Sequence, residues 1–161
     1  MVTLKQELRM TRQFSSPEEE LNLNLQRTVG LLSRPMLQFL KKHGLSPAQY
    51  NILRILRGQP DGGLPCRQIG LRMVTREPDV TRLLDRLEKD GLVSRERSDT
   101  DRRVVTISIT KAGRSLLAGL DEPMRVVHKE SLGHLTRVEI RELNRLLVKA
   151  RQPFLEGDND D

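Results

Sequence analysis

Residues 74–109 constrain the fold of this chain more than any other part of the sequence. The first half of this segment has apolar residues at helical spacing and ends at Gly91, which predicts an amphipathic helix. The second half alternates apolar and polar residues over 105–109, which predicts a strand paired with residues 92–97 across a polar turn. The residues expected on the buried face of the helix are Val80, Leu83, Leu84 and Leu87. The segment should therefore fold as a helix that runs into a two-stranded ribbon.

Helix-start signals precede this segment. Ser16 and Ser46 each stand before a proline, and each can cap a helix whose capping box is closed by Glu19 or by Gln49. The helices expected from these signals cover 17–43 and 47 to about 57. A short helix is also expected at 65–73, and the helix of the main segment should be capped by Thr75 or Glu77.

Two more helices are expected after the ribbon. One starts at Thr110 and should bend or break at Pro123, because proline removes a helical hydrogen bond. The other opens with a capping box formed by Thr136 and Glu139 and continues to about Ala150.

The fold class expected is therefore mostly α with a small β-ribbon, in which a winged helix-turn-helix lobe adjoins a helical dimerisation region (α+β). The boundaries expected are a flexible arm or poorly anchored helix at 1–16, a single domain at 17–155 and a disordered acidic tail at 156–161. Within the domain, the DNA-binding lobe should cover about 46–109, and the dimerisation helices about 17–43 and 110–155.

Charge points to a polyanionic partner for the central part of the chain. The sequence has 28 basic and 22 acidic residues, a net charge of +6. The excess does not extend to residues 104–161, which hold 9 of each sign, whereas residues 54–103 hold 12 basic and 9 acidic residues. Any DNA-binding surface should therefore lie before residue 104.

Several other classes of protein are disfavoured. No apolar run approaches the roughly 20 residues of a membrane span, and no signal peptide is evident, so a cytoplasmic protein without membrane contact is expected. Cys66 is the single cysteine, which suits a reducing compartment. The histidines have no metal-ligand spacing, and no catalytic motif stands out, so neither a metal, a cofactor nor an enzyme is expected.

The polar face of the 74–91 helix is the expected DNA-reading surface. Arginine can donate two hydrogen bonds to guanine, and residues at a helix start can bind phosphate through free backbone N–H groups. The residues expected at this surface are Thr75, Arg76, Pro78, Asp79, Thr81, Arg82 and Arg86. The ribbon should add a cationic tip for the narrow minor groove, formed by Arg95, Arg97, Arg102 and Arg103.

Apolar stripes remain on the first long helix and on the last helix. Together they exceed what one small lobe can bury, which predicts a homodimer. The residues expected in the dimer interface are Leu21, Leu25, Ile140, Leu143 and Leu147.

Three strings of sequence resemble the MarR family of bacterial winged-helix transcription regulators. They are residues 45–56 (LSPAQYNILRIL), 80–93 (VTRLLDRLEKDGLV) and 101–113 (DRRVVTISITKAG), in the order and at the spacing of the family. The resemblance covers roughly residues 17–155 and implies a DNA-binding regulator of a palindromic operator, expected to be a repressor.

The resemblance also implies roles for individual residues. Arg103 would enter the minor groove with Asp101 as its support, and the base-reading residues would come from Arg76, Asp79, Thr81 and Arg82. A pocket between the dimer helices and the DNA lobe would bind a small aromatic or aliphatic anion that releases the DNA. The residues expected there are Pro35, Met36, Phe39, His43, Tyr50 and Arg54.

Two other functions stay open at this point. Winged helices also bind proteins or RNA, so the chain could be an interaction module. Cys66 begins a helix, where a thiol can become reactive, so a redox-responsive regulator is the other alternative.

Overall fold

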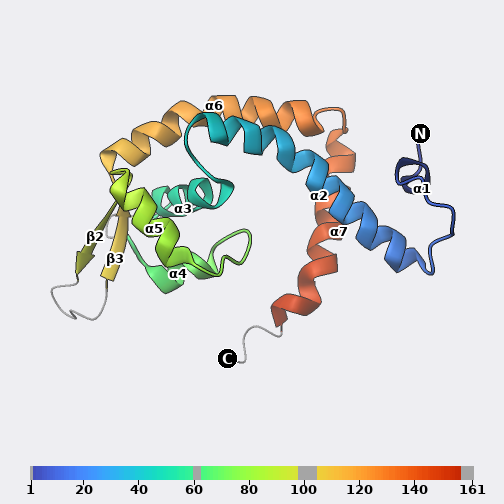
Figure 1. The fold of residues 1–161 in the computed structure, drawn as a ribbon, viewed down its shortest axis with the longest axis horizontal. Coiled ribbons are helices and arrows are strands. Elements are labelled where there is room, and N and C mark those ends of the chain that lie inside the picture. The colour runs from blue at the N-terminus through green and yellow to red at the C-terminus, as the bar shows by residue number, and fades with distance from the viewer. Residues whose placement is uncertain (1, 60–62, 98–104, 157–161) are drawn as a thin grey trace. The chain divides into compact units, whose positions relative to one another are not determined.

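The structure is a computed structural model that describes residues 2–59, 63–97 and 105–156. Its helices are α1 (Leu4–Glu7), α2 (Pro17–Lys42), α3 (Pro47–Arg57), α4 (Cys66–Leu71), α5 (Val80–Lys89), α6 (Lys111–Leu132) and α7 (Arg137–Glu156). Its strands are β1 (Leu64–Pro65), β2 (Val93–Arg97) and β3 (Val105–Ile109). Figure 1 labels these helices and strands. The chain forms two compact units, residues 1–124 and 125–161. The expected class, mostly α with a small β-ribbon, is confirmed.

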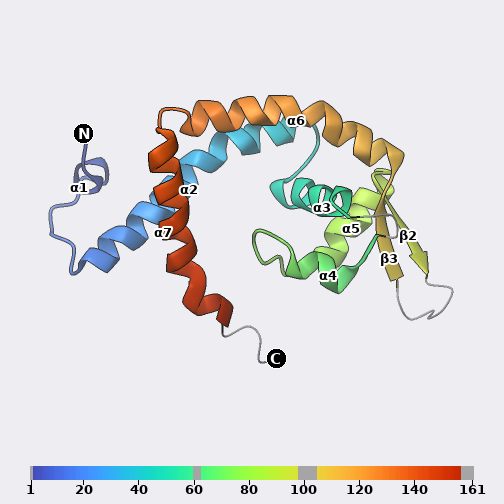
Figure 2. The same cartoon turned by 180° about the vertical axis from the view of Figure 1, so that it is seen from behind.

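The sheet is antiparallel, with the strand order β1-β3-β2. Arg95 of β2 is paired with Ile107 of β3, and β1 pairs with the other side of β3 through Leu64. The hairpin of β2 and β3 confirms the expected ribbon, and Figures 1 and 2 both show it beside α5. Strand β1 was not expected from the sequence, because two residues that include a proline carry no alternation.

Helix α3 lies at the centre of the first unit. It contacts α2, α4, α5 and β3, and the core around it is made of leucine and isoleucine. The largest fully buried side chains are Leu40, Ile52, Leu53, Leu56, Ile69, Leu84, Leu87, Ile107, Leu117 and Leu120. Burial of these side chains is the main force that holds the helix-turn-helix pair, α4 and α5, against the sheet.

The helix caps follow the sequence closely at several places. Ser46 and Gln49 form the expected box, in which the Gln49 N–H donates to Ser46 Oγ at 3.1 Å and the Ser46 N–H donates to Gln49 Oε1 at 2.9 Å. Thr136 and Glu139 form the equivalent box at α7. Gly91, with φ of 68°, ends α5 as expected, because this backbone conformation suits glycine.

Two other expectations concern the start of α2 and Pro123 of α6. The capping box expected at α2 does not form. Ser16 caps α2, but the Glu19 carboxylate accepts from Ser15 rather than closing a box on Ser16. These hydrogen bonds from Ser15 lower the pKa of Glu19. Helix α6 does not break at Pro123 but continues through it to Leu132.

The N-terminal segment contains the short helix α1, capped by Thr3. Leu4 is buried, and the Glu7 carboxylate lies 3.4 Å from Nε of Arg27 on α2. This part of the expected arm therefore has contacts with the first unit.

Candidate nucleic-acid interface

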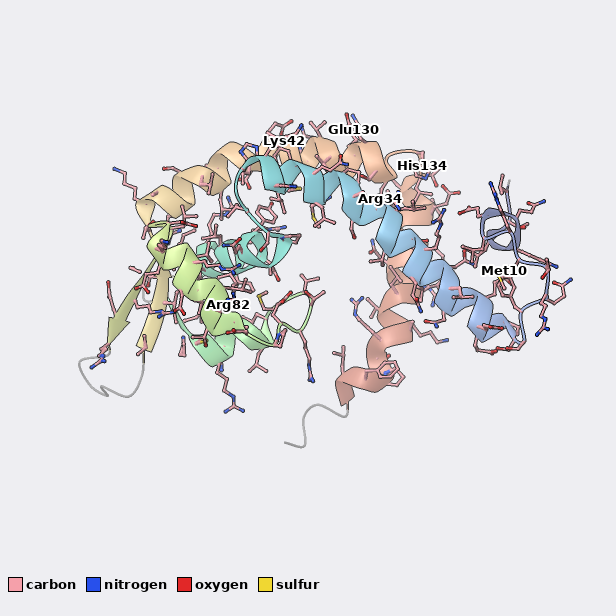
Figure 3. The ribbon with its side chains drawn as sticks, in the orientation of Figure 1. Met10, Arg34, Lys42, Arg82, Glu130 and His134 are labelled. Carbon is pink, nitrogen blue, oxygen red and sulfur yellow. The ribbon has the colours of Figure 1, made fainter. Side chains whose placement is uncertain are left out.

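Helix α5 has one buried and one exposed face. Leu84 and Leu87 are buried, and Val80 and Leu83 are half-buried, which confirms the expected apolar stripe. The exposed polar residues of this helix include Thr81, Arg82, Asp85 and Arg86. Figure 3 labels Arg82 on this helix. Only this face can meet base edges, because the opposite side packs against the core of the unit.

The start of α5 lies later than the sequence predicted. The helix is capped by Asp79, whose carboxylate accepts the Arg82 N–H at 2.9 Å, and neither Thr75 nor Glu77 caps it. The connection from α4 to α5 therefore holds Thr75, Arg76 and Pro78. All three residues are exposed, but they do not belong to the first helical turn. The expectation that Thr75 and Pro78 lie at the start of this helix was wrong.

This connection is fixed by a residue that the sequence did not single out. The Val74 N–H donates to Oδ1 of Asn51 at 2.8 Å, so α3 anchors the connection next to α5. Within the connection, the Thr75 hydroxyl donates to Oε1 of Glu77 at 3.4 Å. Asn51 is half-buried and lies on the side of α3 away from Leu53 and Leu56, and no pattern in the sequence distinguishes it.

The ribbon presents two of its expected arginines within the described residues. Arg97 is exposed at the end of β2. Arg95, two residues earlier on the same strand, instead turns to α5, where Nη2 lies 2.5 Å from Oδ1 of Asp85 and Nη1 lies 3.5 Å from Oε2 of Glu88. The three other expected residues of the ribbon, Asp101, Arg102 and Arg103, lie outside the described residues.

A cavity of about 420 Å³ lies between α5 and the ribbon. It is lined by Cys66, Thr81, Leu84, Arg95, Glu96, Arg97, Val105 and Ile107. Cys66 is half-buried at the start of α4, and its Sγ is 3.9 Å from the Thr81 hydroxyl oxygen. The single thiol is thus adjacent to the candidate reading helix.

Four of the residues expected to bind an effector form two contacts between side chains. The rings of Phe39 and His43 have centroids 4.8 Å apart, and Cζ of Arg54 lies 5.8 Å from the centre of the Tyr50 ring. Pro35 is exposed and Met36 is half-buried. The nearby cavity of about 500 Å³ is lined by other residues, namely Leu37, Gln38, Lys41, Gly44, Leu45, Ser46 and Pro47.

No cluster of histidine, cysteine or carboxylate side chains suited to a metal ion is found among residues 2–59, 63–97 and 105–156. Over the same residues, no helix combines the length and apolar character that a membrane span requires.

A helix pair whose second helix exposes arginine, followed by an antiparallel ribbon, defines a winged helix-turn-helix protein. A sequence profile of the MarR family matches residues 43–104. The HTH-type transcriptional regulator MhqR of Bacillus subtilis is 31% identical over 136 residues, which cover 80% of this chain and 90% of that protein. The chain belongs to the MarR family, whose members are DNA-binding transcription regulators.

Two further comparisons extend this result. The homoprotocatechuate degradative operon repressor of Escherichia coli is 29% identical over 127 residues, which cover 75% of this chain and 84% of that protein. The solved structure of a mutant MarR from Escherichia coli, complexed with operator DNA, matches 81% of this chain and 92% of that chain, with a TM-score of 0.72 and 23% identity. The likeness to this MarR structure supports the winged helix-turn-helix fold of the chain.

Proposed function

We propose that this protein is a homodimeric repressor that binds a roughly palindromic operator through α5 and the ribbon. The observation that carries the proposal is the exposed polar face of α5, with Thr81, Arg82 and Arg86 opposite the buried Leu84 and Leu87. The degradative operon repressor supports this assignment by its role, and the operator-bound MarR structure supports it by its fold.

The dimer rests on apolar residues that the described structure leaves uncovered on single helices. On α7, Ile140 and Leu143 are 37% and 43% exposed, and Phe154, on the same helical face, is 76% exposed. Leu147 continues this face and is half-buried. On α2, Leu21 and Leu25 are also exposed. Exposure of so many large apolar side chains along one face is typical of a surface that a second copy covers.

The dimer sets a geometric requirement for the operator. Because both copies of α5 enter successive major grooves on one side of B-DNA, they should lie about 34 Å apart. The two half-sites should then be related as an inverted repeat. Arg97 and the ribbon residues that follow it would contact the flanking DNA.

Selection of duplexes from a random DNA pool tests the proposal. We expect the wild-type protein to enrich an inverted repeat, and the R82A/R86A variant to lose that enrichment while it remains folded and dimeric. Absence of any enriched duplex would contradict the proposal and favour an interaction module for protein or RNA.

The effector in this proposal is a small aromatic or aliphatic anion. The support is the Arg54 guanidinium beside the Tyr50 ring and the Phe39–His43 ring pair, which together offer a charge and apolar faces. A panel of aromatic and aliphatic carboxylates should include one that raises the melting temperature of the wild-type protein and releases operator DNA. The R54A variant should lose both responses. If no compound in the panel raises the melting temperature or releases operator DNA, the proposed effector is contradicted.

The redox alternative has a simple test on the same operator. If Cys66 has no redox role, peroxide treatment should leave binding by wild-type protein and by C66S equal. Loss of binding by wild-type protein alone would favour a Cys66-based response.

A further inference from the structure

Arg95 occupies a position from which one side chain joins the reading helix to the ribbon. Asp85 and Glu88 lie three residues apart on α5 and so share one face of that helix. The Arg95 guanidinium reaches both, at 2.5 Å from Asp85 and 3.5 Å from Glu88. A planar guanidinium with several donors can hold two carboxylates at once, whereas an ammonium group acts as a point charge.

The charge balance at this cluster argues against phosphate binding by Arg95. One guanidinium faces two carboxylates, so the cluster carries a net charge of −1. The Arg95 side chain is 29% exposed, compared with 56% for Asp85 and 41% for Glu88. A DNA phosphate that approached Arg95 would therefore meet the two more exposed carboxylates first, and like charges repel.

The location of the cluster determines what the contact can control. Arg95 is paired in register with Ile107, which is buried, so the guanidinium is attached to the firmly held part of the ribbon. Asp85 and Glu88 follow Arg82 by about one and two helical turns. The cluster therefore fixes the angle between the surface that reads bases and the strand that leads to Arg97.

We propose that Arg95 is a positioning residue, which holds the ribbon at a fixed angle to α5 through Asp85 and Glu88 and does not itself bind DNA. This inference rests on the proposed function and deepens it. It differs from the expectation that Arg95 belongs to the DNA contacts.

Neutral variants separate positioning from phosphate contact. If Arg95 acts through the carboxylates, R95Q and the double variant D85N/E88Q should each weaken operator binding. The triple variant R95Q/D85N/E88Q should be no weaker than R95Q. Exposed ion pairs are worth about 0.2–1 kcal/mol, so with two copies in the dimer the loss should be roughly 2- to 30-fold.

A phosphate contact predicts the opposite pattern. Removal of two negative charges near DNA would then strengthen binding by D85N/E88Q, and R95Q would reduce the salt slope by roughly 2 per dimer. R95K would then bind the operator as wild type does, since lysine also binds phosphate. If Arg95 instead bridges two carboxylates, R95K should restore operator binding only in part, because an ammonium group cannot replace the planar guanidinium. Either tighter binding by D85N/E88Q or full rescue by R95K would overturn the inference.

Hydrogen exchange of the free protein provides a readout that needs no DNA. We expect R95Q to increase exchange of the amides in β2 and β3 and to leave α7 unchanged. Unchanged exchange in β2 and β3 would overturn the inference whether or not the wild-type protein binds an operator. A wild-type protein that binds no duplex, together with faster exchange in R95Q, would instead count against the proposed function alone.

Discussion

At the scale of single residues, Arg82 is the side chain most constrained to read a base. It lies on the exposed face of α5 in the first turn, where its own N–H is held by Asp79. If Arg82 donates two hydrogen bonds to a guanine, R82A should weaken operator binding by about 1–3 kcal/mol per half-site and relax selection at one symmetric base pair. Binding to a set of single-base operator variants measures both effects.

Lys89 supplies the matched control for this prediction. It lies in the last turn of the same helix and is exposed, so K89A removes an equal charge from the other end of α5. K89A should leave base preference unchanged. If R82A weakens binding to all sequences equally, Arg82 binds phosphate rather than a base.

Residue roles could be predicted from sequence only where they depend on neighbours in the chain. The caps by Ser46 and Thr136 involve partners three residues away, and both were predicted. The cap by Asp79 was missed because Thr75, Glu77 and Asp79 all offer suitable oxygens near Pro78. The pairing of Arg95 with Asp85 could not be predicted, since it depends on how β2 packs against α5.

At the scale of elements, the start of α6 is packed closely against Leu92, which lies between α5 and β2. A Cβ atom on Gly113 would clash with the Leu92 carbonyl oxygen, whereas a Cβ atom on Gly119 would meet nothing within 4 Å. G113A should therefore destabilise the protein by about 1–3 kcal/mol, because backbone must shift to admit the methyl group. Urea unfolding measures the change.

G119A is the control, since it makes the same substitution in the same helix. Alanine favours a helix interior over glycine, so G119A should stabilise the protein by up to about 1 kcal/mol. Equal effects of the two substitutions would show that the contact at Leu92 does not limit the packing of α6.

A second link between elements joins α3 to α6. The Arg57 guanidinium donates to both oxygens of Asp121, at 2.7 and 2.9 Å, and these hydrogen bonds lower the pKa of Asp121. The stability that Asp121 contributes is therefore full above its ordinary pKa of 3.8 and is lost as the pH falls through the lower folded-state value.

D121N should lower the melting temperature at pH 7 by no more than about 3 °C, because both side chains are partly exposed to solvent. The difference from wild type should shrink as the pH falls below 3.8. Thermal unfolding across this pH range measures the difference, and R57Q and R57Q/D121N complete a double-mutant cycle. A difference that stays constant with pH would exclude the ion pair as its cause.

The ends of helices and strands could be predicted where a single strong signal in the sequence marks them. Gly91 ends α5, and the alternation of residues 105–109 predicts β3. Helix α6 does not break at Pro123, because proline weakens a helix locally but α6 gains from burial of Leu117, Leu120 and Met124 on either side. The two-residue strand β1 exists only through its partner β3, so no local pattern in the chain could indicate it.

At the scale of the whole molecule, the apolar face of α7 predicts the oligomeric state. L143D would place a charge in the proposed interface without a partner, and it should convert the dimer to a monomer at micromolar concentration. Sedimentation measures the change. Val138, also on α7 and 65% exposed, lies on the opposite helical face, so V138D should remain a dimer. A wild-type monomer under these conditions would contradict the proposed architecture.

The carboxylate of Asp79 has a consequence for how a regulator of this kind travels along a chromosome. Helix starts attract phosphates, but here a fixed negative side chain already occupies that position on α5. An arbitrary stretch of duplex would gain little there, while a correct half-site could still be held by base contacts from Arg82. Time bound to the wrong sequences would shorten, so the preference for the operator over the rest of the chromosome would be larger than net charge alone suggests.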